Sequence, residues 1–366
     1  MRLGVKEALV GDDIVPGDVQ IEGGRISLVG LSPAGKTGTA VPGFVDLQVN
    51  GFAGVDFIAA GEEGYQTAGP ALASSGVTSY QPTLITSPLD SYPAALAAAA
   101  RAQGKPGPRV LGVHLEGPFI SPEWVGAHNP AHVLDPDPEL AVRLIESGPV
   151  SHMTLAPERP GALELIPLLM KRNITVACGH SDADASQAYA AFDAGSRVLT
   201  HIYNAHRRWR PREPGLAGAA LARESVTVTA IVDNVHLAPE TAAATFRATR
   251  GRFALITDAI EAAGLGDGTF ALGDRRVTVR AGEVRLENGR LAGSVLTMGR
   301  ALQNLVGLGA TLAEAVHAAA RAPALAAGRR DLGLLEEGAL ADVVVLDDRL
   351  EVTRTLVDGR ELWARS

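Results

Sequence analysis

The feature that most constrains the fold is an alternation of short apolar runs with alanine-rich helical stretches between residues 44 and 257. Strands of a parallel sheet that helices cover on both faces are apolar throughout, because neither face meets water. Eight such runs occur, at residues 44–49, 78–83, 110–115, 152–156, 174–177, 198–200, 226–232 and 253–257. Eight strands alternating with helices over roughly 215 residues predict an α/β fold of the (β/α)8 TIM-like barrel type, whose usual size is about 250 residues.

The two ends of the chain differ from this central part. Residues 1–42 and 333–366 hold short β-like segments between glycine turns, so we expect them to form one small β-sandwich module. The barrel would then occupy residues 43–332. Within it, residues 264–293 return to β-like alternation, which predicts a β insertion after the eighth strand.

Composition excludes several classes of function. The formal net charge is −8, so no general basic surface is available for nucleic acid or an anionic membrane. No run of about 18 apolar residues occurs, and residues 1–10 lack the pattern of a secretion signal. Cys178 is the only cysteine, which excludes an intramolecular disulfide. We expect a cytoplasmic protein that acts on a small molecule, with no nucleic-acid or membrane partner.

Polar residues follow four of the predicted strands, where an ordinary core would be apolar. They are Glu116, His180, His201 and Asp258. The carboxyl ends of barrel strands meet at one face, where the active sites of such barrels lie. Two imidazoles and one carboxylate are a familiar catalytic metal set that leaves a position open for water. A single histidine at a strand end is more often structural, but the set together predicts that Glu116, His180 and His201 bind a metal.

Asp258 is predicted to be the general base and acid. A divalent cation lowers the pKa of its bound water from 15.7 toward about 7, and a second group must then accept a proton. Asp258 is placed to accept that proton and later to donate it to a leaving amine. By itself the residue would be interpreted as the N-cap of a helix over 259–263. Its position beside a metal set favours the catalytic interpretation.

Ligands for a second metal are missing. The first strand of a two-metal hydrolase would supply histidines at alternate positions, which face the same side. Those positions hold Gln48 and Asn50, and we interpret them as vestigial second-metal positions. No lysine ends a predicted strand, so a metal-bridging carboxylated lysine and a Schiff-base lysine are excluded. We therefore predict one divalent metal per subunit, with Zn²⁺ favoured and Fe²⁺, Mn²⁺ and Co²⁺ as alternatives.

Six ordered motifs resemble those of one family. They are VPGFVDLQVNG at 41–51, HLEGPF at 114–119, GAHNP at 126–130, GHS at 179–181, THIYNA at 200–205 and REPG at 212–215. In these motifs the chain resembles the N-acetylglucosamine-6-phosphate deacetylases of the amidohydrolase superfamily. The resemblance extends from residue 41 to residue 294, and the terminal β module is also similar.

The resemblance implies hydrolysis of the acetamide of N-acetyl-D-glucosamine 6-phosphate to D-glucosamine 6-phosphate and acetate. The metal ligands of the family fall on Glu116, His180 and His201, and its acid/base aspartate falls on Asp258. The implied substrate contacts are Ala127, His128, Asn204, Ala205, Arg212, Asp233, His236, Leu291, Ala292 and Gly293. A homodimer is also implied, in which Arg212 reaches the phosphate in the partner subunit's site.

Two of these contacts have a clear chemical rationale. His236 follows a predicted strand and could donate a hydrogen bond to the acetamide oxygen, where negative charge develops, which makes it a second catalytic candidate. Arg212 offers the planar bidentate geometry that suits phosphate. It belongs to an arginine cluster in residues 207–212 that could instead be a solvated face. Residues 206–211 depart from the family pattern, and their extra arginines could replace cations that lysines supply elsewhere in the family.

Two other functions stay open. A cyclic amide hydrolase, similar to dihydroorotase or allantoinase, would use the same barrel, but Gln48, Asn50 and the absent bridging lysine argue against it. A catalytically silent sensor of amino sugar phosphates would explain the missing histidines of the first strand. The complete set of predicted metal ligands together with Asp258 argues against a silent barrel.

Overall fold

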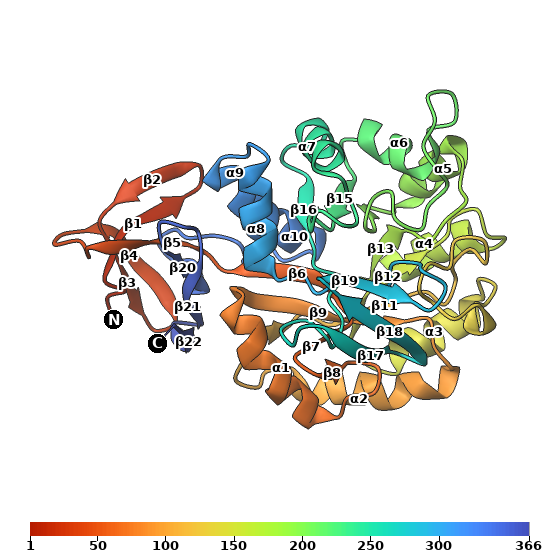
Figure 1. Cartoon of the computed structure of the whole chain (residues 1–366), viewed down its shortest axis with the longest axis horizontal. Helices are drawn as coiled ribbons and strands as arrows, with labels where there is room; N and C mark the ends of the chain where they lie inside the picture. The colour runs from red at the N-terminus through yellow and green to blue at the C-terminus, as the bar shows by residue number, and fades with distance from the viewer. Residues whose placement is uncertain (366) are drawn as a thin grey trace.

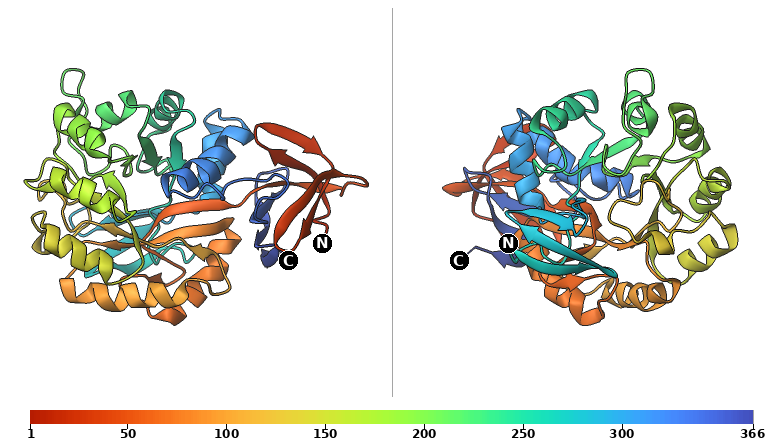
Figure 2. Two further views of the ribbon diagram at one scale, coloured as in Figure 1. Left: turned by 180° about the vertical axis from the view of Figure 1, so that it is seen from behind. Right: turned by 45° about the vertical axis from the view of Figure 1, so that its right-hand side comes forward.

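The computed structural model describes residues 1–365, and its central part is a parallel barrel surrounded by helices (Figure 1 and Figure 2). Eight strands form the barrel wall: β6 (Phe44–Val49), β9 (Val77–Ile85), β11 (Val113–Glu116), β12 (Val150–Leu155), β13 (Thr175–Cys178), β14 (Val198–Leu199), β15 (Thr227–Ala230) and β16 (Phe253–Leu255). The short β10 (Arg109–Val110) pairs beside β9. The barrel closes where the Asp258 N–H donates to the Gln48 carbonyl at 2.9 Å. The predicted barrel is confirmed.

Burial explains why the strands are apolar. Every residue of β6 and of β9 is buried, as expected for strands that are covered on both faces. The covering helices are α1 (Glu62–Ser74), α2 (Tyr92–Ala102), α3 (Pro138–Glu146), α4 (Ala162–Met170), α5 (Ala185–Ala194), α6 (Gly215–Ala222), α7 (Pro239–Ala248) and α8 (Met298–Gly307). N-cap side chains mark the start of several of these helices. Asp137 accepts from the Leu140 N–H before α3, and Asp184 with Gln187 forms a capping box at α5.

The last helical stretch is longer than the sequence pattern predicts. The pattern predicts a helix over 311–320, whereas α9 (Leu312–Val316) continues through a π-helical turn, His317–Arg321, into α10 (Ala322–Ala326). Pro323 has no N–H to continue the helical hydrogen bonding, and it follows directly on the π-helical turn, in which the Ala322 N–H donates to the His317 carbonyl. Across residues 1–365, no helix combines the length and the apolar character needed to cross a membrane.

The two ends of the chain meet in one β module at the side of the barrel (Figure 1). One sheet contains β2 (Asp13–Pro16), β1 (Val5–Val10), β5 (Thr37–Pro42), β20 (Val343–Leu346), β21 (Val352–Val357) and β22 (Arg360–Ala364), in that order. The hairpin of β3 (Asp18–Glu22) and β4 (Arg25–Leu31) forms a second sheet. Val19, Ile26 and Val343 belong to the apolar cluster of this module. The module built from both ends is therefore as predicted, and its boundaries at residues 42 and 333 stay a prediction.

A small sheet lies over the carboxyl face of the barrel. It contains β17 (Gly268–Leu272), β18 (Arg275–Arg280) and β19 (Glu283–Leu286), which pair antiparallel. Its apolar residues, including Leu272 and Val277, cluster with Ile85 at the end of β9 and with Ile260. A short hairpin of β7 (Gly51–Phe52) and β8 (Val55–Asp56) follows β6. The small sheet falls within residues 264–293, and its packing places the loop after β19 beside the strand ends.

We expect Asp342→Ala to loosen the contact between the terminal module and the barrel. The Asp342 side chain, only 6% exposed, accepts from Arg109 Nη1 at 2.6 Å. It also accepts from the Asp358 N–H at 3.0 Å. Removing this carboxylate leaves a half-buried guanidinium without that partner, which should lower the free energy of unfolding by roughly 2–4 kcal/mol. Urea unfolding measures the loss.

The matched control is Asp348→Ala, which removes a carboxylate that is 82% exposed and pairs with Lys6 at 2.9 Å. An exposed pair contributes about 0–1 kcal/mol, so this variant should unfold near the wild-type midpoint. An equal loss of unfolding free energy in the two variants would show that Asp342 does not stabilise the contact between the terminal module and the barrel.

Candidate metal centre

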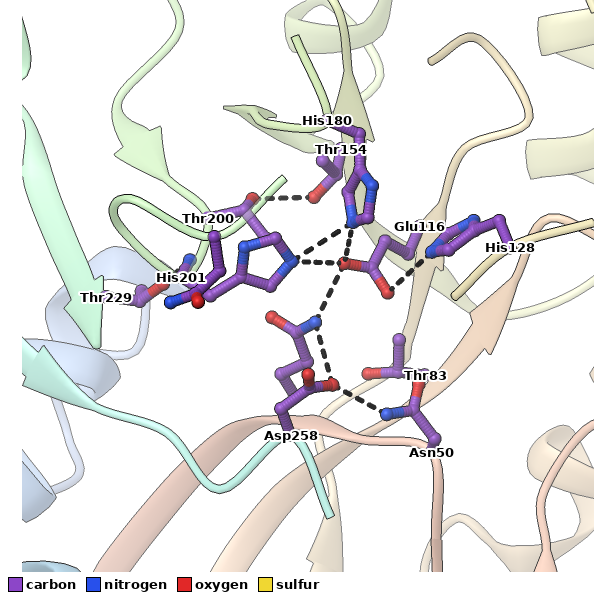
Figure 3. Close-up of polar contacts among 12 residues, drawn as sticks. Asn50, Thr83, Glu116, His128, Thr154, His180, Thr200, His201, Thr229 and Asp258 are labelled. Carbon is purple, nitrogen blue, oxygen red and sulfur yellow. Dashed lines mark hydrogen bonds and ion pairs between the residues drawn. The ribbon is translucent and has the colours of Figure 1, made fainter. Parts of the chain in front are cut away.

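Three of the strand-end residues meet at the carboxyl ends of the barrel strands (Figure 3). Glu116 is the last residue of β11, and His180 and His201 follow β13 and β14. Glu116 Oε1 lies 3.1 Å from His180 Nε2 and 2.9 Å from His201 Nε2. The two Nε2 atoms are 3.1 Å apart, and all three side chains are buried. Within residues 1–365, this is the one group of His, Cys, Asp or Glu side chains with the spacing of a metal site.

The donor set suits a divalent cation. His180 Nδ1 lies 3.0 Å from the Trp124 carbonyl, which can only accept, so Nδ1 carries the proton and the lone pair of Nε2 faces the cluster. Burial, with a smaller contribution from the charge of His128, lowers the pKa of His180 to about 4 and keeps the ring neutral. Neutral imidazole and carboxylate are ordinary ligands of zinc and related cations. The residues present therefore fit a metal.

The backbone of the site is held in an uncommon conformation. His180, His201 and Asp258 have φ of 49°, 28° and 50°, in the left-handed region that side-chain-bearing residues rarely adopt. Neighbouring segments stabilise these residues. The His201 N–H donates to Thr229 Oγ1 at 2.8 Å, and the His180 carbonyl accepts from the Ser121 N–H at 2.8 Å. Such strained positions persist where the surroundings fix them, and here they place the side chains above the strand ends.

Two amides connect the cluster to Asp258. Gln48 Nε2 donates to Glu116 Oε1 at 2.9 Å and to Asp258 Oδ1 at 3.1 Å. Asn50 Nδ2 donates to the same Asp258 oxygen at 2.7 Å (Figure 3). Burial and then the negative charge of Glu116 raise the pKa of Asp258 to about 6. Both amides therefore donate their N–H groups to carboxylates. Asp258 Oδ2 receives neither of these hydrogen bonds, so it is available to another partner.

Asp46 is a supporting group that the sequence pattern did not reveal. This buried carboxylate on β6 accepts from Thr257 Oγ1 at 2.6 Å and from the Thr257 N–H at 3.2 Å. Burial raises the pKa of Asp46 to about 7. It joins the first barrel strand to the residue before Asp258. The available signal was a single acidic residue inside an otherwise apolar strand.

A cavity of about 430 Å³ opens above the cluster. The predicted site residues that line it are Asn50, Glu116, Ala127, His128, His180, His201, Asn204, Ala205, His236, Asp258, Leu291 and Gly293. The predicted residues outside its lining are Gln48, Arg212, Asp233 and Ala292. Ala292 is buried in the apolar cluster of the small sheet, and Arg212 is exposed to solvent. Gln48 and Asp233 are hydrogen-bonded to residues that line the cavity. Gln48 donates to Glu116 and Asp258, and Asp233 accepts from His236.

Two histidines of the cavity are oriented by hydrogen bonds. Asp233 accepts from His236 Nδ1 at 2.7 Å and from the His236 N–H at 2.8 Å, which leaves Nε2 as the ring nitrogen available to a ligand. His128 Nδ1 accepts from the Thr86 N–H at 3.2 Å. His128 Nε2 therefore carries a proton, and it lies 3.4 Å from Glu116 Oε2. Both rings are positioned before any ligand binds.

Gly293 allows the loop after β19 to reach Asp258. Its φ is 65°, and a Cβ atom there would lie 2.5 Å from Ile260 Cγ2 and 2.9 Å from the Asp258 carbonyl oxygen. The next residue, Ser294, donates its N–H to that carbonyl at 2.8 Å. Only glycine permits this close approach, so the loop and the catalytic candidate are joined through the backbone.

Several lining residues were not predicted from the sequence, and they include Glu123, Trp124, Arg208 and Arg290. Arg208 lies in residues 206–211, where the chain departs from the family pattern, and Arg290 directly precedes the predicted Leu291. The sequence places four arginines in residues 207–212, but it carries no signal that separates the one at the cavity from its neighbours.

Comparisons with known proteins agree on one family. Residues 39–362 match the model of the amidohydrolase family. N-acetylgalactosamine-6-phosphate deacetylase of Escherichia coli O157:H7 is 38% identical over 328 residues, which are 87% of this chain and 86% of that protein. Human N-acetylglucosamine-6-phosphate deacetylase is 37% identical over 338 residues, 88% of this chain and 83% of that protein.

A solved structure agrees over the full chain. It is a variant of the Mycobacterium smegmatis N-acetyl-D-glucosamine-6-phosphate deacetylase in complex with N-acetyl-D-glucosamine-6-phosphate. Its TM-score with this chain is 0.93, the sequences are 35% identical, and the alignment covers 99% of each chain.

We expect Glu116→Gln to lose the metal. The substitution keeps the size of the side chain but removes the only negative charge of the ligand set, so metal affinity should fall about 10–100-fold or more. Metal content after dialysis, measured by mass spectrometry, should be one divalent ion per wild-type chain and far less in the variant. His132→Asn, at a surface histidine that pairs with Asp274, serves as the control and should keep the metal. Full metal retention by Glu116→Gln would show that Glu116 is not a ligand.

Proposed function

Because the chain belongs to the amidohydrolase family, we propose that it hydrolyses the acetamide of N-acetyl-D-glucosamine 6-phosphate to D-glucosamine 6-phosphate and acetate. The main support is the buried group of Glu116, His180 and His201, which lies beside Asp258 at the base of one cavity. Deacetylases of amino sugar phosphates are also the relatives named above, at 37–38% identity.

Glu116, His180 and His201 would hold one divalent cation. When bound, such a cation supplies Lewis-acid activation of water and of an amide oxygen. We propose Zn²⁺, because two imidazoles and a carboxylate are a common catalytic zinc set. Fe²⁺, Mn²⁺ and Co²⁺ accept the same ligands, and supply in the cell selects among them.

Asp258 would move the proton. Gln48 and Asn50 both donate to its Oδ1, so Oδ2 is free to accept a proton from the attacking water. The same oxygen then donates this proton to the leaving nitrogen as the carbon–nitrogen bond breaks. A pKa of about 6 suits both steps near neutral pH, since the group is ionised at first and remains a competent acid once protonated.

The other predicted site residues would bind and orient the sugar. His236, held by Asp233, is assigned to the acetamide oxygen, where donation from Nε2 stabilises developing negative charge. The proposed sugar contacts are Ala127, His128, Asn204, Ala205, Leu291, Ala292 and Gly293. We also propose a cytoplasmic homodimer in which Arg212 reaches the partner subunit's site. The exposure of Arg212 and its place outside the cavity lining support that arrangement.

A second candidate substrate differs only at one carbon. The relative at 38% identity is a deacetylase of N-acetylgalactosamine 6-phosphate, the C4 epimer of the proposed substrate. Acetate release from the two epimers, compared as kcat/KM with purified zinc-loaded protein, decides between them. Release from neither phosphorylated sugar would remove the proposed function.

Asp258→Asn should lower kcat about 10²–10⁴-fold, because the amide cannot accept the proton from water. Acetate release measures the loss, and the metal content should stay at the wild-type value because Asp258 is outside the ligand set. Asp193→Asn makes the same chemical change at a surface carboxylate that is 65% exposed, and it should leave turnover unchanged. Turnover retained in Asp258→Asn would remove this residue from its role.

Activity should fall as the pH falls through the pKa of Asp258. The base is ionised above that pKa and protonated below it, so kcat/KM should drop about tenfold per unit on the acid side. The metal-free value is about 6, and a neighbouring cation favours the carboxylate, so the midpoint should lie at or below about 6.

The variant Asn50→Ala tests whether Asp258 is the group that titrates on the acid side of this pH profile. The Asn50 amide donates to the charged form of Asp258 and lowers its pKa, so its loss should move the limb upward by up to about one pH unit. Asn204→Ala is the control, since Asn204 also lines the cavity but donates to the Ile202 carbonyl. An unmoved limb in Asn50→Ala would assign it to a group other than Asp258.

A further inference from the structure

Trp124 lines the cavity, and its polar groups are hydrogen-bonded within the protein. Its backbone N–H donates to the Ser121 carbonyl at 3.1 Å, and its own carbonyl lies 3.0 Å from His180 Nδ1. The indole Nε1 donates to Asp182 Oδ1 at 2.8 Å. Only apolar surface of this residue is therefore left for a ligand. Among the lining residues of the described chain, Trp124 is the one phenylalanine, tyrosine or tryptophan.

The acceptor of the indole N–H is itself fixed by two other segments. Arg207 donates to both carboxylate oxygens of Asp182, at 3.1 and 2.6 Å. The Asp182 N–H donates to Glu158 Oε1 at 2.6 Å. Arg207 belongs to residues 206–211, where the chain departs from the family pattern. The orientation of the indole is therefore set before any ligand binds.

The contacts of Trp124 run from the metal end of the cavity toward its rim. The Trp124 carbonyl faces His180, whose side chain is 5% exposed. The indole N–H faces the pair of Asp182 and Arg207, whose side chains are 28% and 37% exposed. The indole therefore extends outward from the metal ligands, along the wall of the cavity.

We propose that the indole face of Trp124 packs against the pyranose ring of the substrate and that Asp182 positions the indole, an inference that rests on the proposed deacetylase function. The acetamide must reach the metal end, so the sugar ring that carries it occupies the next part of the cavity. A hexopyranose with mostly equatorial substituents exposes axial C–H groups on its two faces. These groups pack well on a flat aromatic surface.

The other apolar side chains of the lining do not offer such a surface. They are alanine, isoleucine and leucine, which present methyl groups rather than a plane. A tryptophan whose N–H already has a partner buries a large area against a ligand and loses little conformational freedom when it does so. Trp124 is therefore the residue of the lining that is best suited to bind the ring itself.

The test compares the KM of Trp124→Leu and Trp124→Phe with that of wild-type protein. Leucine removes the aromatic surface, so KM for N-acetyl-D-glucosamine 6-phosphate should rise about 5–30-fold. Phenylalanine keeps a flat ring but lacks the indole N–H, so the rise should be about 2–5-fold. The kcat and the metal content should change little, because each variant keeps the backbone carbonyl beside His180. An unchanged KM in Trp124→Leu would overturn the inference.

A double-mutant cycle isolates the positioning role of Asp182. In the wild-type background, Asp182→Ala should raise KM about 3–10-fold, because the indole N–H loses its acceptor. In the Trp124→Phe background the same change should have little effect, since no N–H remains to be held. An equal rise in both backgrounds would show that Asp182 does not act through Trp124.

The matched control is Asp331→Ala. Asp331 accepts from Arg329 Nε and Nη2 at 2.8 and 2.6 Å, so it forms the same kind of two-oxygen pair, and it lies outside the cavity lining. This variant should keep the wild-type KM. A rise of KM equal to that of Asp182→Ala would overturn the assignment of Asp182.

Tryptophan fluorescence separates failure of this inference from failure of the proposed function. The chain has three tryptophans, so Trp209→Phe combined with Trp363→Phe leaves Trp124 as the only one. Saturating D-glucosamine 6-phosphate should change the emission of this double variant, because the sugar then covers the indole. Unchanged emission would overturn the contact even if acetate is released. Wild-type protein that releases no acetate from the phosphorylated sugar would instead remove the proposed function.

Discussion

The site depends on the burial of one carboxylate. Placing Glu116 at the closed end of a cavity costs several kcal/mol unless its charge is compensated. Burial tends to raise its pKa, but the hydrogen bond from His128 and the adjacent rings of His180 and His201 outweigh that effect and keep it well below its usual range. Gln48 adds a further donor. These contacts hold a negative charge where a cation can bind.

The barrel supplies that compensation from strands far apart in the sequence. Parallel strands bring their carboxyl ends to one face, so side chains from β6, β11, β13 and β14 converge there. The amides of Gln48 and Asn50 show how the first strand takes part without metal ligands. Each donates to Asp258 Oδ1, so the proton-transfer candidate is fixed by hydrogen bonds. A single cation together with an oriented carboxylate is a coherent alternative to a two-metal site.

Much of this could be predicted because strand periodicity and strand-end chemistry are local signals. The apolar runs predicted the barrel, and the polar residues after four of these runs predicted which side chains would share its open face. Asp46 was missed because a carboxylate in an apolar strand gives no indication of its partner, and Thr257 lies more than two hundred positions away. Ala292 lies outside the cavity lining because its side chain packs into the apolar cluster of the small sheet, and its contact with substrate stays a prediction.

The sequence by itself determined the number of barrel strands, the module built from both ends, and the identity of the residues that gather around Glu116. Those properties follow from hydrophobic pattern and residue type. Only the tertiary structure decided which arginine of residues 207–212 lines the cavity, and that Arg290, in the loop after β19, lines it as well. The reason is physical. A guanidinium is neutralised or left available by the carboxylates that folding brings within reach, and local sequence does not encode those distances.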